Sequence, residues 1–106
     1  MNHGNTGLIA VRKAGEVLLK IWTDCGGENA VDVADAIRET GQVPGINEAS
    51  MLATVAGFGC DDCRMVVAWS GGTTREETEP GEVFKDVTAS PCYGRAPADY
   101  REVVDI

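Results

Sequence analysis

Apolar residues form two short runs near the start of the chain, at residues 8–11 and 17–22, separated by a break that contains glycine. Runs of this length that flank a short turn predict a β-hairpin. Successive side chains of a strand point to opposite faces, so Val17, Leu19 and Ile21 would share one face. We expect that face to meet the core.

The spacing of apolar residues changes from strand-like to helical after the next pair of glycines. Four apolar residues fall at i, i+3, i+4 and i+7, namely Ala30, Val33, Ala34 and Ile37. This stripe predicts an amphipathic helix. Asn29 is suited to cap its start and Gly41 to end it.

A second helix is predicted over residues 48–57, with Asn47 as its N-terminal cap. Ile46 and Met51 hold the two positions of a hydrophobic staple. Apolar residues occupy most of this segment, so we expect the helix to be largely buried.

Two further strands are predicted, at residues 64–70 and 82–89. The first is apolar on both faces, which is typical of a central strand, whereas the second is more polar and suits an edge. Residues 98–106 fit either a helix or a strand. The final element therefore stays open.

The predicted order is β-β-α-α-β-β. Strands that are neighbours in sequence usually pair as hairpins, which predicts an α+β fold: an antiparallel sheet of about four strands with two helices on one face. We expect residues 7–106 to form this single domain and residues 1–6 to be a flexible N-terminus.

Composition narrows the choice of partners. The chain has 106 residues, 43% of them hydrophobic, and its nine basic and seventeen acidic residues give a net charge of −8. This charge opposes binding to nucleic acid and to anionic membranes, both of which attract Lys and Arg. No apolar run approaches the roughly 20 residues of a membrane span, and no signal-peptide pattern is present, so a cytoplasmic protein is expected.

The chain contains four cysteines, Cys25, Cys60, Cys63 and Cys92. A reducing cytoplasm favours thiols or metal ligands over disulfides. Four thiolates can complete a tetrahedral structural zinc site. Cys60 and Cys63 also have the spacing of redox pairs, although Asp61 and Asp62 between them disfavour the thiolate. The third interpretation is four small packing residues and no cofactor.

No catalytic set is evident. The one histidine, His3, falls in the predicted flexible terminus, so no Ser–His or Cys–His unit is expected. The acidic pairs at residues 61–62 and 76–77 lie in predicted loops, where solvated carboxylates are usual. They keep a small enzyme that uses loop carboxylates as an alternative.

The sequence thus predicts a small acidic, non-enzymatic accessory module that binds a protein partner, or a second copy of itself through the sheet. The first alternative is a zinc-stabilised binding domain built on the four cysteines. The predicted partner-binding residues are the outer stripe of the first helix together with one tryptophan: Glu28, Asp32, Asp35, Glu39 and Trp22. The stripe suits a basic partner. Trp22 shares a strand face with Lys20 and is expected to be partly exposed.

Overall fold

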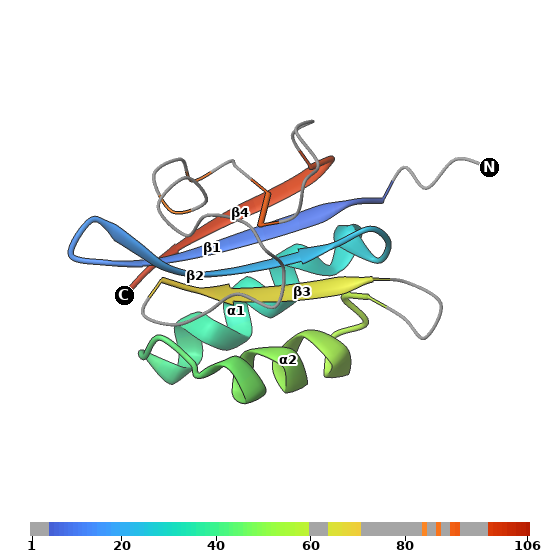
Figure 1. Ribbon diagram of the computed structural model, residues 1–106. Coiled ribbons are helices and arrows are strands. Elements are labelled where there is room, and N and C mark those ends of the chain that lie inside the picture. The colour runs from blue at the N-terminus through green and yellow to red at the C-terminus, as the bar shows by residue number, and fades with distance from the viewer. Residues whose placement is uncertain (1–4, 60–63, 71–83, 85–86, 88–89, 92–97) are drawn as a thin grey trace.

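The computed structural model describes residues 5–59, 64–70, 84, 87, 90, 91 and 98–106. Within this part of the chain, four strands form one sheet and two α-helices cover one of its faces (Figure 1). The predicted α+β class and the order β-β-α-α-β-β are confirmed.

The chain begins its sheet with the predicted hairpin, in which β1 (Gly7–Lys13) pairs antiparallel with β2 (Glu16–Thr23). Ala14 and Gly15 form the two-residue loop, with φ of 55° and 81°. Positive φ at both positions is the signature of a type I′ turn, whose twist matches that of the flanking strands.

A β-bulge interrupts this hairpin at Leu18. Val11 pairs with Leu19 and Arg12 with Val17, so the register shifts between the two pairs and Leu18 is inserted. The side chain of Arg12 points to the face of the sheet opposite to that of Val11. Val17 pairs with Arg12 and therefore points to the same face as Arg12. Val17 is buried as predicted, with 7% of its surface exposed, but it lies on the face opposite to Leu19 and Ile21, because the single inserted residue reverses the alternation.

The first helix matches the sequence pattern closely. A 3-10 turn, η1 (Gly27–Asn29), leads into α1 (Ala30–Thr40), and the four predicted stripe residues are all buried. Gly41 ends the helix in the left-handed region, as predicted. Asn29 makes no side-chain cap hydrogen bond; it lies in the preceding turn, and its amide donates to the carbonyl of Gly57 at 3.0 Å.

The second helix, α2 (Ile46–Val55), begins two residues earlier than predicted, with Gly45 as its N-cap. It buries Ala49 and Ala53, whereas Met51 is 68% exposed and Val55 is 87% exposed. The expectation of a largely buried helix is therefore wrong. The fully buried positions of α2 are alanines at i and i+4, and Leu52 packs partly buried against the core beside them, so only a narrow stripe of the helix meets the core.

The remaining strands are β3 (Met65–Trp69) and β4 (Tyr100–Asp105), which identifies the ambiguous C-terminal segment as a strand. The order is β3-β2-β1-β4, with β3 antiparallel to β2 and β4 parallel to β1. The sheet is therefore mixed rather than wholly antiparallel. In the described sheet β3 lies at an edge rather than at the centre. Most of the strand predicted over residues 82–89 lies outside the described residues.

Phe58 closes one end of the core and is fully buried. It follows Gly57, which has a φ of 80°, and its N–H donates to the carbonyl of Ala53 at 2.9 Å. This is the C-terminal arrangement of a Schellman motif, in which a hydrophobic residue after the glycine packs back on the helix. A Cβ added to Gly7 would lie 2.6 Å from the Phe58 ring, so β1 passes directly over it.

Both ends of the described chain are held by contacts to the rest of the domain. The predicted flexible segment 1–6 lies mostly outside the described residues, but the Asn5 carbonyl accepts from Gly27 N at 2.7 Å. Arg12 and Asp105 form an ion pair of 2.7 Å between β1 and β4. The hydrogen bond from Arg12 lowers the pKa of the Asp105 carboxyl. Desolvation opposes this effect, and the Coulomb attraction of Arg12 and Arg38 adds smaller lowering contributions.

Candidate functional site

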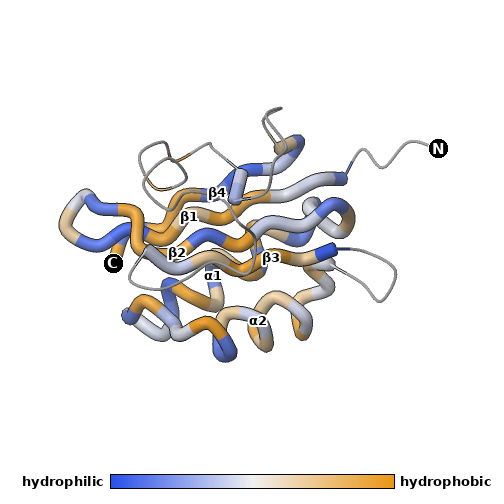
Figure 2. Tube along the Cα trace, in the orientation of Figure 1, coloured by the Kyte–Doolittle hydropathy of each residue, from blue (hydrophilic) through white to orange (hydrophobic). Residues whose placement is uncertain are grey.

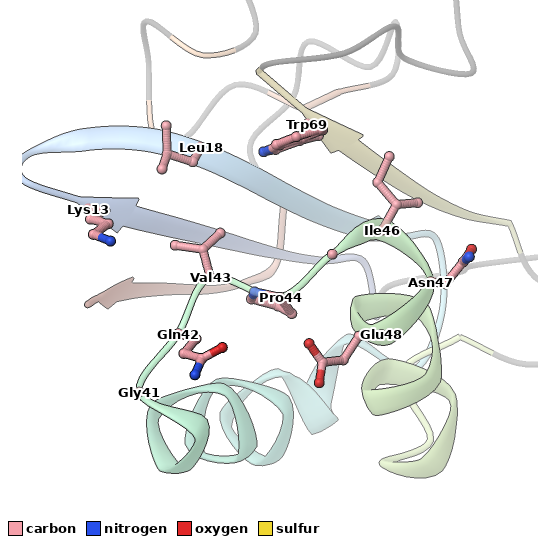
Figure 3. Close-up of a pocket in the computed structure, with 11 residues that line it drawn as sticks. Lys13, Leu18, Gly41, Gln42, Val43, Pro44, Ile46, Asn47, Glu48 and Trp69 are labelled. Carbon is pink, nitrogen blue, oxygen red and sulfur yellow. The ribbon is translucent and has the colours of Figure 1, made fainter.

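A cleft of about 660 Å³ opens where the loop between α1 and α2 faces the sheet (Figure 3). Three strands contribute one side chain each: Lys13, Leu18 and Trp69. The opposite wall is the segment 41–48, which contains the loop and the first turn of α2. Pockets that hold small ligands or anchoring side chains commonly measure about 300–1,000 Å³, so this cleft is large enough for either.

The walls of the cleft are mainly apolar, and two large side chains stand at its mouth. Trp69 is 44% exposed and Ile46 is 37% exposed, although both belong to regular elements. Pro44 is buried beneath them, with Leu18 and Val43 half-buried. A tryptophan that keeps almost half of its surface in water is available to contact a partner, and tryptophan is among the residues enriched at binding hot spots.

The β-bulge explains how Leu18 comes to line the cleft. Because Leu18 has no partner in the β1–β2 register, its side chain is released from the regular alternation of β2. Its carbonyl accepts from Ser70 N at 3.0 Å, and the adjacent Leu19 pairs with Trp69. The bulge and the end of β3 therefore hold Leu18 and Trp69 as neighbours on one rim (Figure 3).

The loop wall is held by local hydrogen bonds. The Thr40 hydroxyl donates to the Ile37 carbonyl at 2.7 Å and accepts from Gln42 N at 3.2 Å. Gly41 has a φ of 68°, which reverses the chain after α1, and Pro44 fixes its own φ before α2 begins. Each of these features restricts the loop, so the cleft is largely preformed.

The polar groups of the cleft differ in sign from one rim to the other. Lys13 supplies a cation at the end of β1, and Glu48 supplies an anion in the first turn of α2. Ala49 N donates to Gly45 O at 2.8 Å, which leaves the three preceding N–H groups of α2 without an intrahelical acceptor. Gly45 provides no side-chain cap.

The predicted acidic stripe is exposed and lies on α1 and the turn before it. Glu28, Asp32, Asp35 and Glu39 are all solvent-accessible. Arg38 lies within the stripe and pairs with Asp35 at 2.9 Å and with Glu102 at 3.5 Å. Part of the negative charge of the stripe is therefore balanced within the domain.

Trp22 does not belong to the same surface as the stripe. It neighbours Ile21, which faces the helices, so Trp22 points to the opposite face of the sheet, where it is half-buried. The charge of Lys20 suggested that this face meets solvent, but Lys20 is fully buried. The five predicted partner-binding residues are thus divided between two faces of the domain.

Cys25 is disulfide-bonded. The expectation of four thiols is therefore wrong, since a cysteine in a disulfide has neither a free thiol nor a thiolate for zinc. Cys60, Cys63 and Cys92 lie outside the described residues. Within the described part of the chain, no group of three or more His, Cys, Asp or Glu side chains could hold a metal ion. The four-thiolate site stays a prediction that requires Cys25 in its reduced form.

The oxidation state of Cys25 has a direct test. We expect no more than two of the four cysteines to react with a thiol reagent in the unfolded, unreduced protein, because one disulfide occupies two of them. Reduction should restore all four and lower the free energy of unfolding by about 2–4 kcal/mol. Four reactive thiols before reduction, together with one bound zinc, would instead support the zinc-stabilised domain.

Sequence reasoning missed the cleft. Its parts are a bulge, a strand end and a helix–helix loop, which are distant in sequence and uninformative separately. One signal was present: Trp69 is a large aromatic residue at the end of a strand, and Ser70 and two glycines follow it in the sequence. The Pro44–Gly45 pair similarly marks a sharp turn between two helices.

Comparison with protein-family models, with curated proteins and with solved structures finds no match to this chain. Among the described residues, no helix has both the length and the apolar character required to cross a membrane. Functional inference therefore depends on the geometry of the domain itself.

Proposed function

We propose that this protein is a small binding module that acts on no substrate, and that the cleft beside Trp69 is its docking site for a protein partner. The observation that carries the proposal is the exposure of Trp69 and Ile46 at the mouth of a preformed apolar cleft. Both side chains would lose their contact with water on binding, and burial of this kind supplies most of the energy at binding hot spots.

The shape of the cleft favours one anchoring side chain over an extended interface. A volume of about 660 Å³ accommodates a single aromatic or long aliphatic side chain with room for flanking backbone. Pro44 in the loop wall is buried and Leu18 in the sheet wall is half-buried, so the anchor would contact apolar atoms on both sides. We therefore expect a partner segment that presents one large apolar residue.

The charges around the cleft select the neighbours of that anchor. Lys13, at the sheet rim, favours an acidic group on that side of the anchor. Glu48 disfavours an acidic group near the rest of the first turn of α2. The expected motif is an apolar anchor with a carboxylate close to one side.

Selection from a displayed peptide library tests this proposal. Peptides enriched on the wild-type protein should carry an aromatic or long aliphatic anchor beside an acid, and Trp69→Ala should lose them. Loss of one such anchor commonly weakens binding by about 2 kcal/mol or more, which is at least about thirtyfold. Met51→Ala is the matched control, because Met51 is exposed on α2 but does not line the cleft. Enrichment that survives in Trp69→Ala would contradict the proposed site.

A second docking surface, the acidic stripe on α1, is supported by the exposure of its four carboxylates. The stripe suits a basic partner whose encounter is accelerated by charge. Asp32 and Glu39 are the residues to neutralise, because Asp35 is already engaged by Arg38. An association rate that is independent of salt and unchanged in Asp32→Asn/Glu39→Gln would exclude the stripe as a docking surface.

A further inference from the structure

The cleft beside Trp69 has a cation at one end. Figure 2 shows hydrophilic colour at the turn end of the β1–β2 hairpin, whereas β3 is hydrophobic along most of its length. Lys13 lies at that turn end, is exposed and lines the cleft. Figure 3 places it on the side of Leu18 and Val43, away from Ile46. A ligand in the cleft therefore meets apolar walls and, at one end, a positive charge.

The charge of Lys13 is not balanced by a described acid. Arg12 pairs with Asp105, and Arg38 pairs with Asp35. No ion pair within the described part of the chain involves Lys13, although the whole sequence has seventeen acidic residues against nine basic ones. This ammonium group is available to a carboxylate that arrives with the ligand.

The size of the cleft limits where the ligand can carry that carboxylate. A volume of about 660 Å³ takes one large side chain and its flanking backbone. In an extended segment, the next side chain points to the opposite face, and the one after it lies about 7 Å further along the chain. An α-carboxylate is bonded to the Cα of the anchor residue itself. It therefore enters the cleft together with the anchor side chain.

Glu48 and the charge of the whole chain disfavour a ligand with several acids. Glu48 lines the cleft from the first turn of α2, and the net charge is −8. A chain terminus satisfies Lys13 with one carboxylate and adds no charge near Glu48. The residues before it have room to leave beside Gly45, where an added Cβ would meet no atom within 4 Å.

We propose that the partner docks by its carboxyl terminus. The large apolar side chain of its last residue packs against Trp69 and Ile46, and the α-carboxylate of the same residue pairs with Lys13. This inference rests on the docking site proposed above and adds the identity of the segment that occupies it.

Three acetylated peptides with the same anchor test the proposal. The first is Gly-Ser-Gly-Ser-Phe with a free carboxyl terminus, and the second is its carboxamide. The third is the carboxamide of Gly-Ser-Phe-Asp-Gly, which has the same net charge as the first. Affinities are measured from the backbone signals of residues 41–48 in a proton–nitrogen correlation spectrum. At low ionic strength the free acid should bind about fivefold more tightly than either carboxamide, because its carboxylate is the one placed at Lys13.

Two variants of the protein test the role of Lys13. Lys13→Gln should remove the preference for the free acid and leave the affinity for its carboxamide unchanged. Arg101→Gln is the matched control, because Arg101 is exposed on β4 and does not line the cleft. It removes the same charge from the chain and should retain the preference.

The outcomes separate this inference from the docking site on which it rests. If the three peptides bind equally and Trp69→Ala loses them all, the site stands and the terminal carboxylate is overturned. A preference for the free acid that survives in Lys13→Gln would overturn it as well. If no peptide binds, or if Trp69→Ala does not weaken binding, the docking site itself fails and this inference fails with it.

Discussion

Replacing Phe58 with alanine should lower the free energy of unfolding by about 3–5 kcal/mol. The ring is fully buried and fills the space between the end of α2 and the start of β1, where Gly7 passes within contact distance. Its removal loses apolar burial and leaves a cavity that the surrounding backbone cannot fill, because the Schellman motif around Gly57 fixes the chain there.

Chemical denaturation with urea measures this loss, and Val55→Ala supplies the control. Val55 also ends α2, but it is 87% exposed, so its truncation should change the free energy of unfolding by less than about 0.5 kcal/mol. If Phe58→Ala and Val55→Ala had similar effects, the packing described for Phe58 would be incorrect.

Replacing Gly26 with alanine should cost about 2–4 kcal/mol, from two separate sources. The φ of Gly26 is 80°, a conformation that strains any residue with a Cβ. The added Cβ would also lie 2.5 Å from the Gly57 carbonyl oxygen and 2.7 Å from Gly59 N, and both are backbone atoms. The junction between the start of η1 and the end of α2 would have to open.

Gly41→Ala separates these two sources. Gly41 also has a positive φ, 68°, but a Cβ there would meet no atom within 4 Å. Its replacement should therefore cost only the backbone strain, about 1–2 kcal/mol. Equal losses for the two variants, measured by thermal unfolding, would mean that the close approach at Gly26 contributes nothing.

The parts of the fold that depend on local periodicity could be predicted from the sequence. The stripe of α1 from Ala30 to Ile37 is buried as expected, since the same spacing that specifies a helix also specifies its inner face. The hairpin could also be predicted from the sequence, because a two-residue turn with glycine at its second position sets the pairing of β1 with β2.

Features that depend on non-local pairing could not be predicted. β4 pairs with β1 rather than with a sequence neighbour, and nothing within residues 100–105 encodes that choice or its parallel direction. The bulge at Leu18 likewise cannot be predicted from the alternation of apolar and polar residues in β2, because a bulge is defined by the pairing with the partner strand. One inserted residue moved Val17 from the predicted core face and helped to form the cleft.

Burial of α2 was predicted from composition and was wrong for a related reason. An apolar helix can bury its large residues or its small ones, and the sequence of Met51, Ala53 and Val55 does not say which face meets the sheet. The oxidised state of Cys25 was missed because a cytoplasmic location was assumed first. That location stays a prediction, and the thiol count described above bears on it directly.

The most direct test of the docking site uses the two tryptophan side chains as separate reporters in a proton–nitrogen correlation spectrum. The probe is 3-phenylpropionate, an aromatic group with one carboxylate, and its neutral amide is the control. Trp69 lines the cleft, whereas Trp22 is half-buried on the opposite face of the sheet. We predict that the acid shifts the Trp69 indole signal and the backbone signals of residues 41–48, more strongly than the amide does, while the Trp22 indole stays in place. A spectrum in which neither probe moves the Trp69 indole, or in which both indoles move alike, would contradict the cleft as the binding site of this protein.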